Sequence, residues 1–213
     1  MMSFFRTLSA LLVAALLAVT LFAAPAARAD EVADAQTLVN HLMSDAIATF
    51  GGKSLPMAER GRQLRRMIGQ YADVDLAAKD ILGRYWDKAS PAQQAEFKPL
   101  VVDYAVGSWS RQLSDLPTDQ RVEFTTSETT PSGRLLLHSL MHNSNDVTPV
   151  DWIIGHAADG HLVIADVAIS GVSIVHTMHA DFSTIIRANG GQLPPLFDAL
   201  RTKIASYGTA GQN

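Results

Sequence analysis

The chain has 213 residues and a net charge of −4; 47% of its residues are hydrophobic and none is a cysteine. This length fits one domain with a packed core. The acidic balance argues against a nucleic acid partner, because binding to phosphates depends on clustered Lys and Arg. Without cysteine, the chain has neither a disulfide framework nor a thiol that could carry a lipid anchor.

The N-terminus has the layout of an export signal. Arg6 precedes the apolar run "LSALLVAALLAVTLFAA", and "ARA" (27–29) forms a small-residue cleavage site. An uncleaved membrane anchor is the alternative, but the run is only about transmembrane length and contains two hydroxyl residues. We therefore predict that residues 1–29 are a cleavable signal peptide, that residues 30–213 form a single domain, and that the mature protein is periplasmic.

Four helices are predicted in the first half of the mature chain. Apolar residues at spacings of three and four indicate them, and Gly, Pro and capping side chains mark their ends. In the longest one, "SPAQ" (90–93) is a capping box, and Pro99 should kink or break the helix because proline removes a backbone donor. The predicted ranges are 30–50, 56–71, 76–82 (capped by Asp73 or Asp75) and 90–113.

After Pro117 the pattern changes to short runs between turn residues, which is typical of strands. Their connections are too short for parallel crossovers, so they predict an antiparallel meander. Helical spacing then returns after Ser173, which can cap one helix, and again from Pro194 to about Tyr207. The order predicts an α+β domain. The four predicted strands are 122–128, 134–142, 150–157 and 162–169.

The last predicted strand, "LVIADVAI" (162–169), is largely apolar on both of its faces. A sheet that is apolar on both faces has to be covered on both, by helices or by something other than protein. The sequence therefore leaves room for a ligand against the sheet.

The sequence contains no convincing catalytic constellation. It has no cysteine nucleophile, no G-x-S-x-G elbow and no Gly-rich turn followed by Lys that would cradle a phosphate. His176 and His179 are spaced i, i+3 on a predicted helix with Asp181 nearby, but they lack a clear third ligand, so a polar helix surface or a pocket rim is favoured over a metal site. We predict no catalytic residue, no metal and no cofactor.

Several stretches, taken in order, carry a family resemblance. They are "LGRYW" (82–86), "ASPAQQAEF" (89–97), "DY" (103–104), "VDWII" (150–154) and "DVAISGVS" (166–173), followed by a helix that ends before a Gly pair. This ordered set resembles the MlaC family, also called the toluene-tolerance or Ttg2 auxiliary family, which includes the hopanoid-associated HpnM proteins. The resemblance covers most of the mature chain.

The resemblance implies a periplasmic lipid carrier. Such a carrier takes a phospholipid, or in the HpnM branch a hopanoid, between an inner-membrane ABC transporter complex and an outer-membrane acceptor. It also implies a monomer with an NTF2-like α+β fold, in which helices and a twisted antiparallel four-stranded sheet enclose an apolar cavity. Typical members carry more cations where this chain has "GHLVIADV" (160–167) and "HTMH" (176–179), so a neutral or polycyclic lipid is favoured.

Candidate lipid-binding residues follow from the strand pattern and the helix ends. Trp152, Ile154, Leu162 and Ile164 share a face if the hairpin register is simple. Trp86 at a helix end could be a lip of the cavity or ordinary core, and both interpretations stay open. The full predicted set is Leu82, Trp86, Tyr104, Leu135, Leu137, Trp152, Ile154, Leu162, Ile164, Val172 and Val175.

Two functions of other classes compete with the carrier. One is an NTF2-like periplasmic enzyme in which His176 or His179 works with Asp166 as a base. The other is a structural adaptor of an envelope complex, whose groove is filled by protein rather than by lipid.

Overall fold

The computed structural model describes residues 28–209 of the chain. All but the last two residues of the predicted signal peptide lie outside this range. Within it, no helix is long and apolar enough to cross a bilayer. An N-terminal helix covers residues 28–50. The other elements are α2 (Met57–Tyr71), α3 (Val74–Leu82), η1 (Gly83–Tyr85), α4 (Pro91–Trp109), η2 (Gln112–Asp115), β1 (Arg121–Thr129), β2 (Leu135–His142), β3 (Val147–His156), β4 (Leu162–Ile169), β5 (Val172–Ser173), α5 (Ile174–Ala188) and α6 (Pro194–Thr209).

The strands form one antiparallel sheet in the order β1-β2-β3-β4-β5, which confirms the predicted meander. The predicted number of strands was wrong by one. β5 has two residues and pairs with the end of β4 across a two-residue turn, Ser170-Gly171, in which both residues have positive φ. A tight hairpin turn uses this conformation, but two residues are too few to show a strand pattern in the sequence.

Side-chain caps begin three of the helices as predicted. Asp73 accepts hydrogen bonds from the backbone N–H groups of residues 75 and 76, and Ser173 accepts one from residue 176. Ser90 and Gln93 form the complete capping box of α4. α4 continues through Pro99, so of the two predicted outcomes, a kink or a break, the break does not occur. Pro99 lies on the exposed side, where water can satisfy the carbonyl that its ring leaves without a donor.

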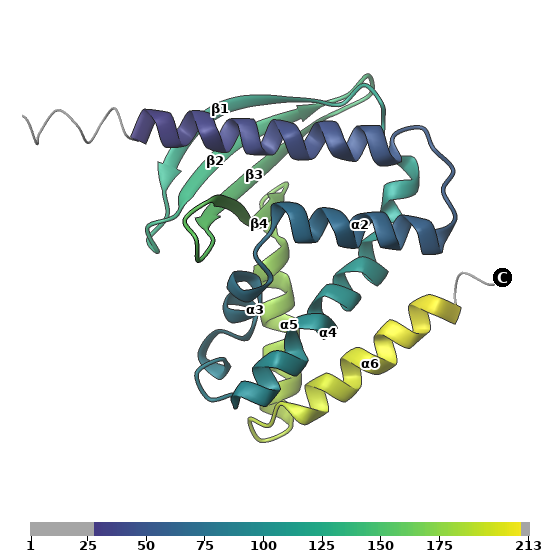
Figure 1. The fold of residues 1–213 in the computed structure, drawn as a ribbon, viewed down its shortest axis with the longest axis vertical. Coiled ribbons are helices and arrows are strands. Elements are labelled where there is room, and N and C mark those ends of the chain that lie inside the picture. Colours follow the sequence, from purple (N-terminus) through teal and green to yellow (C-terminus); the bar gives the residue numbers. More distant parts are fainter. Residues whose placement is uncertain (1–27, 210–213) are drawn as a thin grey trace, which may run out of the picture.

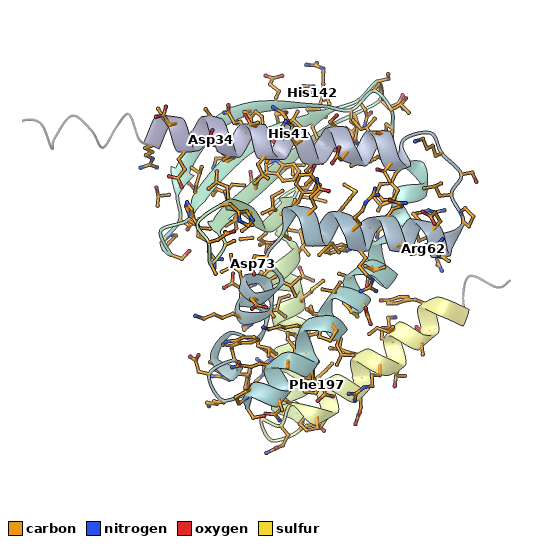
Figure 2. All side chains as sticks on the ribbon, in the orientation of Figure 1. Asp34, His41, Arg62, Asp73, His142 and Phe197 are labelled. Carbon is orange, nitrogen blue, oxygen red and sulfur yellow. The ribbon has the colours of Figure 1, made fainter. Side chains whose placement is uncertain are left out.

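The helices and the sheet form two hydrophobic cores. In Figure 1 the N-terminal helix and α2 lie along one face of the sheet, and α3, α4, α5 and α6 form a separate group beside it. The sheet core joins Val39, Phe50 and Met67 of the two helices to β2, β3 and β4. The helical core is centred on Phe97, whose ring meets Phe182 edge-on at 6.2 Å and stacks on Phe197 at 6.1 Å; Figure 2 shows Phe197 within this group.

The opposite face of the sheet is covered only in part. α3 contacts it closely at Gly155, where an added Cβ would lie 2.7 Å from Leu76. Further along, Leu136 and His138 are half-buried, and the His138 ring lies 2.7 Å from the Asp151 carboxylate. The apolar strand pattern suggested that both faces of the sheet are covered. In the structure one face is covered only in part.

Replacing Phe97 by alanine should destabilise the protein strongly, because the side chain is fully buried between two other aromatic rings. We expect Phe97→Ala to lower the free energy of unfolding by about 3–5 kcal/mol, measured by urea denaturation. Phe97→Leu is the matched control and should cost clearly less, since it keeps most of the apolar volume. Equal losses for the two variants would contradict this account of the helical core.

Candidate functional site

The larger of two apolar pockets lies between the N-terminal helix, α2, the segment around η2 and the covered face of the sheet. Its volume is about 480 Å³, within the range of about 300–1,000 Å³ that small-molecule sites usually have. Gln120 and Thr148 bring polar groups to its wall. The other lining residues are Leu42, Met43, Ala46, Phe50, Leu64, Met67, Ile68, Tyr71, Ala72, Trp109, Leu113, Leu116, Met141, Val150, Trp152, Ile164, Val167 and Ile169.

The Tyr71 hydroxyl in this wall is not free to act as a charged group. It lies 2.5 Å from the Asp45 carboxylate and donates its hydrogen bond there. Burial is the larger cause, and the hydrogen bond to Asp45 the smaller one, that together raise the pKa of Tyr71 to about 12. The phenol is therefore neutral at physiological pH.

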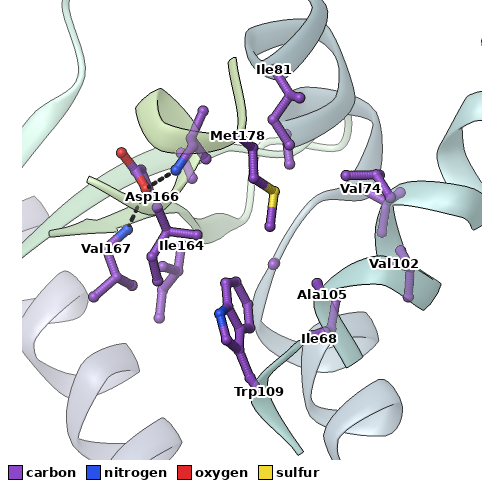
Figure 3. A pocket seen from close by; sticks show the side chains of 16 residues that line it. Ile68, Val74, Ile81, Val102, Ala105, Trp109, Ile164, Asp166, Val167 and Met178 are labelled. Carbon is purple, nitrogen blue, oxygen red and sulfur yellow. Dashed lines mark hydrogen bonds between the residues drawn. The ribbon is translucent and has the colours of Figure 1, made fainter. Parts of the chain in front are cut away.

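The smaller pocket, of about 150 Å³, lies where α3, α4 and α5 meet the edge of β4. Figure 3 shows the Trp109 ring projecting into it, with Met178 and Ile164 near. Asp166 is the one charged residue of its wall. The other lining residues are Ile68, Ala72, Val74, Ala77, Ile81, Val101, Val102, Ala105, Ile164, Ala165, Val167, Ile174, Val175 and Met178.

The Asp166 carboxylate is occupied by local hydrogen bonds. It accepts from the backbone N–H of Val167 at 2.8 Å, from the backbone N–H of Val175 at 3.0 Å, and from the Ser173 hydroxyl. Two of these donors belong to the start of α5, where the helix dipole favours a negative charge. Asp166 thus holds α5 onto β4, and these bonds leave it poorly suited to serve as a base.

A β-bulge at Ala165 sets which residues face the pockets. Ile154 of β3 pairs with Ile164, but the preceding residue, Ile153, pairs with Asp166, so Ala165 is extra. Directly paired residues lie on one face of an antiparallel sheet, and the bulge therefore brings Ile164 and Val167, three apart, to the same face. Ile164 and Val167 each line the larger and the smaller apolar pocket. The two apolar faces predicted for this strand result from this bulge and from the helices that pack beside it.

The predicted binding residues fall into three groups in the structure. Trp152 lines the larger pocket, Val175 the smaller and Ile164 both; Tyr104 and Val172 line a shallower hollow next to Trp109. The others are absent from the walls of the two apolar pockets. Leu135, Leu137 and Ile154 are buried in the sheet core with Leu162 against it, and Leu82 is buried in the helical core with Trp86 against it.

The sequence analysis missed four of the five residues that both pockets share. These are Ile68, Ala72, Trp109, Ile164 and Val167, of which only Ile164 was predicted. They come from α2, the residue after it, α4 and β4. No local pattern marks such a set, because it exists only where the three elements meet.

The "LGRYW" stretch has a packing role in the structure. Gly83 has φ of 53°, and an added Cβ would lie 2.8 Å from Cε1 of His179. The His179 Nδ1 lies 2.9 Å from the carbonyl oxygen of Ile81, at the end of α3. Tyr85 is buried, with the Arg84 guanidinium over its ring. Gly83 is therefore needed so that the imidazole can approach the last turn of α3.

His176 and His179 line a second hollow, on the less covered face of the sheet, together with Asp166. Their ring centroids are 6.5 Å apart. Arg134 and Asp80, in the same wall, are paired with each other by two hydrogen bonds. Among residues 28–209, no three His, Asp or Glu side chains are grouped closely enough to hold a metal ion.

The sequence profile of the MlaC protein family matches residues 38–202, which is most of the chain. The chain belongs to the MlaC family. This MlaC-family chain is similar in structure to a phospholipid-binding protein from Ralstonia solanacearum in complex with a phospholipid. The TM-score is 0.70 at 20% identity, over 82% of this chain and 99% of that one, and this likeness shows a shared fold. No curated protein matches the chain.

Adding a methyl group at Gly83 of this MlaC-family protein should strain the end of α3. We expect Gly83→Ala to lower the free energy of unfolding by about 1–3 kcal/mol, because both the positive φ and the approach of His179 oppose a side chain. Chemical denaturation measures the loss. In a His179→Ala background the loss should be smaller, since the ring that meets the new Cβ is gone. An equal loss in both backgrounds would contradict the contact.

Proposed function

We propose that this protein is a periplasmic lipid carrier that shields hydrocarbon in the two adjoining apolar pockets. The observation that carries the proposal is the wall of these pockets, which is almost entirely aliphatic and aromatic and whose one charged group, Asp166, is occupied by hydrogen bonds. Membership of the MlaC family and the phospholipid bound by the Ralstonia protein of the same fold support it.

Transfer energies explain why such a carrier needs partners. Moving about fifteen methylenes of one chain from water into an apolar pocket favours binding by about 12 kcal/mol. Spontaneous release into water is negligible on that scale. The lipid must therefore pass directly between apolar sites, and we propose that these belong to an inner-membrane ABC transporter complex and an outer-membrane acceptor.

The chemistry of the pocket walls bears on the lipid headgroup. Neither apolar pocket has Lys or Arg among its lining residues. A phosphate taken inside would lose its hydration without gaining a cation, which is costly. The headgroup therefore stays outside the pockets, or the lipid is neutral, as a hopanoid is; both phospholipid and hopanoid remain part of the proposal.

We propose that the protein has no catalytic step. The enzyme alternative needs Asp166 as a base beside His176 or His179. Asp166 accepts from two backbone N–H groups and a hydroxyl, and the His179 Nδ1 lies at hydrogen-bonding distance from a helix-end carbonyl. These contacts favour structural roles for both residues.

Purified protein should carry lipid, identified by mass spectrometry of a solvent extract. Val167→Asp, which places a charge in the wall of both pockets, should reduce the bound lipid by more than about tenfold, because an unpaired carboxylate there is strongly unfavourable. Leu136→Asp is the matched control on the opposite face of the sheet and should retain the lipid. Folded wild-type protein without lipid, and unable to take any up, would refute the carrier.

Replacing both His176 and His179 by alanine should leave lipid carriage within about twofold of wild type, because neither lines the two apolar pockets. The measurement is lipid per folded protein, with circular dichroism as the check on folding. Loss of bound lipid by a folded double variant would show that the histidines belong to the binding mechanism.

A further inference from the structure

The larger apolar pocket opens at the end of β4. Ile169 is the most exposed of its lining residues, at 49%. It pairs directly with Val172 of β5, so the two side chains lie on the same face of the sheet. Val172 is 62% exposed. A lipid that extends out of the larger pocket past Ile169 therefore reaches Val172 next.

Val172 belongs to the wall of the shallower hollow between α4 and α5, which we call the hydroxyl hollow. Its volume is about 230 Å³. It shares Trp109 with both apolar pockets and Met178 with the smaller one, and Figure 3 shows Met178 pointing toward the Trp109 ring. The hydroxyl hollow therefore adjoins both apolar pockets. Its lining residues are Tyr104, Ser108, Trp109, Val172, Ser173, Ile174, Thr177, Met178 and Asp181.

The polar groups of the hydroxyl hollow are mainly hydrogen-bond acceptors. The Thr177 hydroxyl donates its hydrogen to the carbonyl of residue 173 at 2.7 Å, and the Ser173 hydroxyl donates to Asp166. Both hydroxyl oxygens can still accept a hydrogen bond. A ligand group that is rich in donors therefore suits this wall better than one that can only accept.

The charge of the hydroxyl hollow comes from Asp181. No Lys or Arg is among the lining residues that the structure describes. Within residues 28–209 the exposed Asp181 carboxylate forms no hydrogen bond and no ion pair. The nearby start of α5 does not offset this charge, because the N–H groups of residues 175 and 176 are bonded to Asp166 and Ser173. The wall therefore repels an anion and attracts a cation.

We propose that the hydroxyl hollow receives the polar headgroup of the lipid and that Asp181 favours a headgroup that carries an ammonium. Ile169 and Val172 cover the hydrocarbon nearest the headgroup, the ammonium reaches Asp181, and the phosphate stays in water. On the scale in which about 150 Å³ holds a benzene ring, 230 Å³ suits a group the size of phosphoethanolamine. This inference rests on the proposed function, because it concerns the polar end of the same lipid.

The experiment is a competition between two phospholipids with the same tails. Purified protein is incubated with vesicles that contain equal amounts of isotope-labelled dioleoyl phosphatidylethanolamine and dioleoyl phosphatidylglycerol, then re-isolated, and both labelled lipids are quantified by mass spectrometry. The first lipid carries an ammonium and the second has a net negative charge. Dividing each variant's ethanolamine to glycerol ratio by that of wild type cancels the unequal tendency of the lipids to leave the bilayer.

We expect Asp181→Asn to lower this ratio about threefold, the size expected of an ion pair that stays in contact with water. Asp181→Arg should lower it further, since the new cation attracts the anionic lipid. Asp87→Asn is the matched control: it also removes an exposed carboxylate, but one that precedes the start of α4 and lies outside both apolar pockets and the hydroxyl hollow. It should leave the ratio unchanged.

The outcomes separate this inference from the proposed function. An unchanged ratio in folded Asp181 variants, or an equal fall in Asp87→Asn, overturns the role of Asp181, while lipid uptake by wild type still supports the carrier. Wild-type protein that copurifies with lipid but takes up neither phospholipid also overturns the headgroup inference alone. Wild-type protein that holds no lipid and takes up neither phospholipid refutes the carrier itself.

Discussion

The Asp166 carboxylate joins the two parts of this structure. It belongs to β4, and it accepts hydrogen bonds from the start of α5, so the helical group is held against the edge of the sheet at this point. The β-bulge at Ala165 makes the arrangement possible, because it turns Asp166 toward α5 while Ile164 and Val167 stay on the pocket face. The smaller pocket exists because the helices meet the sheet only partly at this junction.

The two apolar pockets have different relations to the hydrophobic cores. Each core is closed by its own contacts: the helical one around Phe97, and the sheet core between the N-terminal helix and the strands. The smaller pocket lies where these two packed units meet, whereas the larger pocket lies within the sheet core, and Phe50, Met67 and Trp152 belong to both. Part of the sheet core therefore maintains stability and also forms the wall of the proposed lipid site.

Local signals in the sequence predicted much of the fold. Asp73, Ser90 and Ser173 cap helices through hydrogen bonds to residues two or three positions away, so their role is visible in the sequence. Short runs between turn residues predicted four of the strands, and their short connections predicted the antiparallel order. The two-residue β5 was missed, and the sequence left open whether Pro99 kinks or breaks α4, because both depend on the surroundings of the segment.

The candidate site was less accessible to sequence analysis. Strand alternation indicated Trp152 and Ile164, but the bulge changes the alternation and adds Val167 to the same face. The place of Trp109 in both pocket walls could not be predicted from the sequence, because it depends on how α2, α4 and β4 pack together.

The smaller pocket also determines how the protein responds to pressure. Its wall is apolar apart from Asp166, so water there finds few hydrogen-bond partners and the side chains around the pocket are imperfectly packed. Unfolding eliminates imperfectly packed space and reduces the volume of the system, and compression therefore favours the unfolded chain. A hydrocarbon tail that fills the space removes this penalty, so the loaded molecule withstands higher hydrostatic pressure than the empty one.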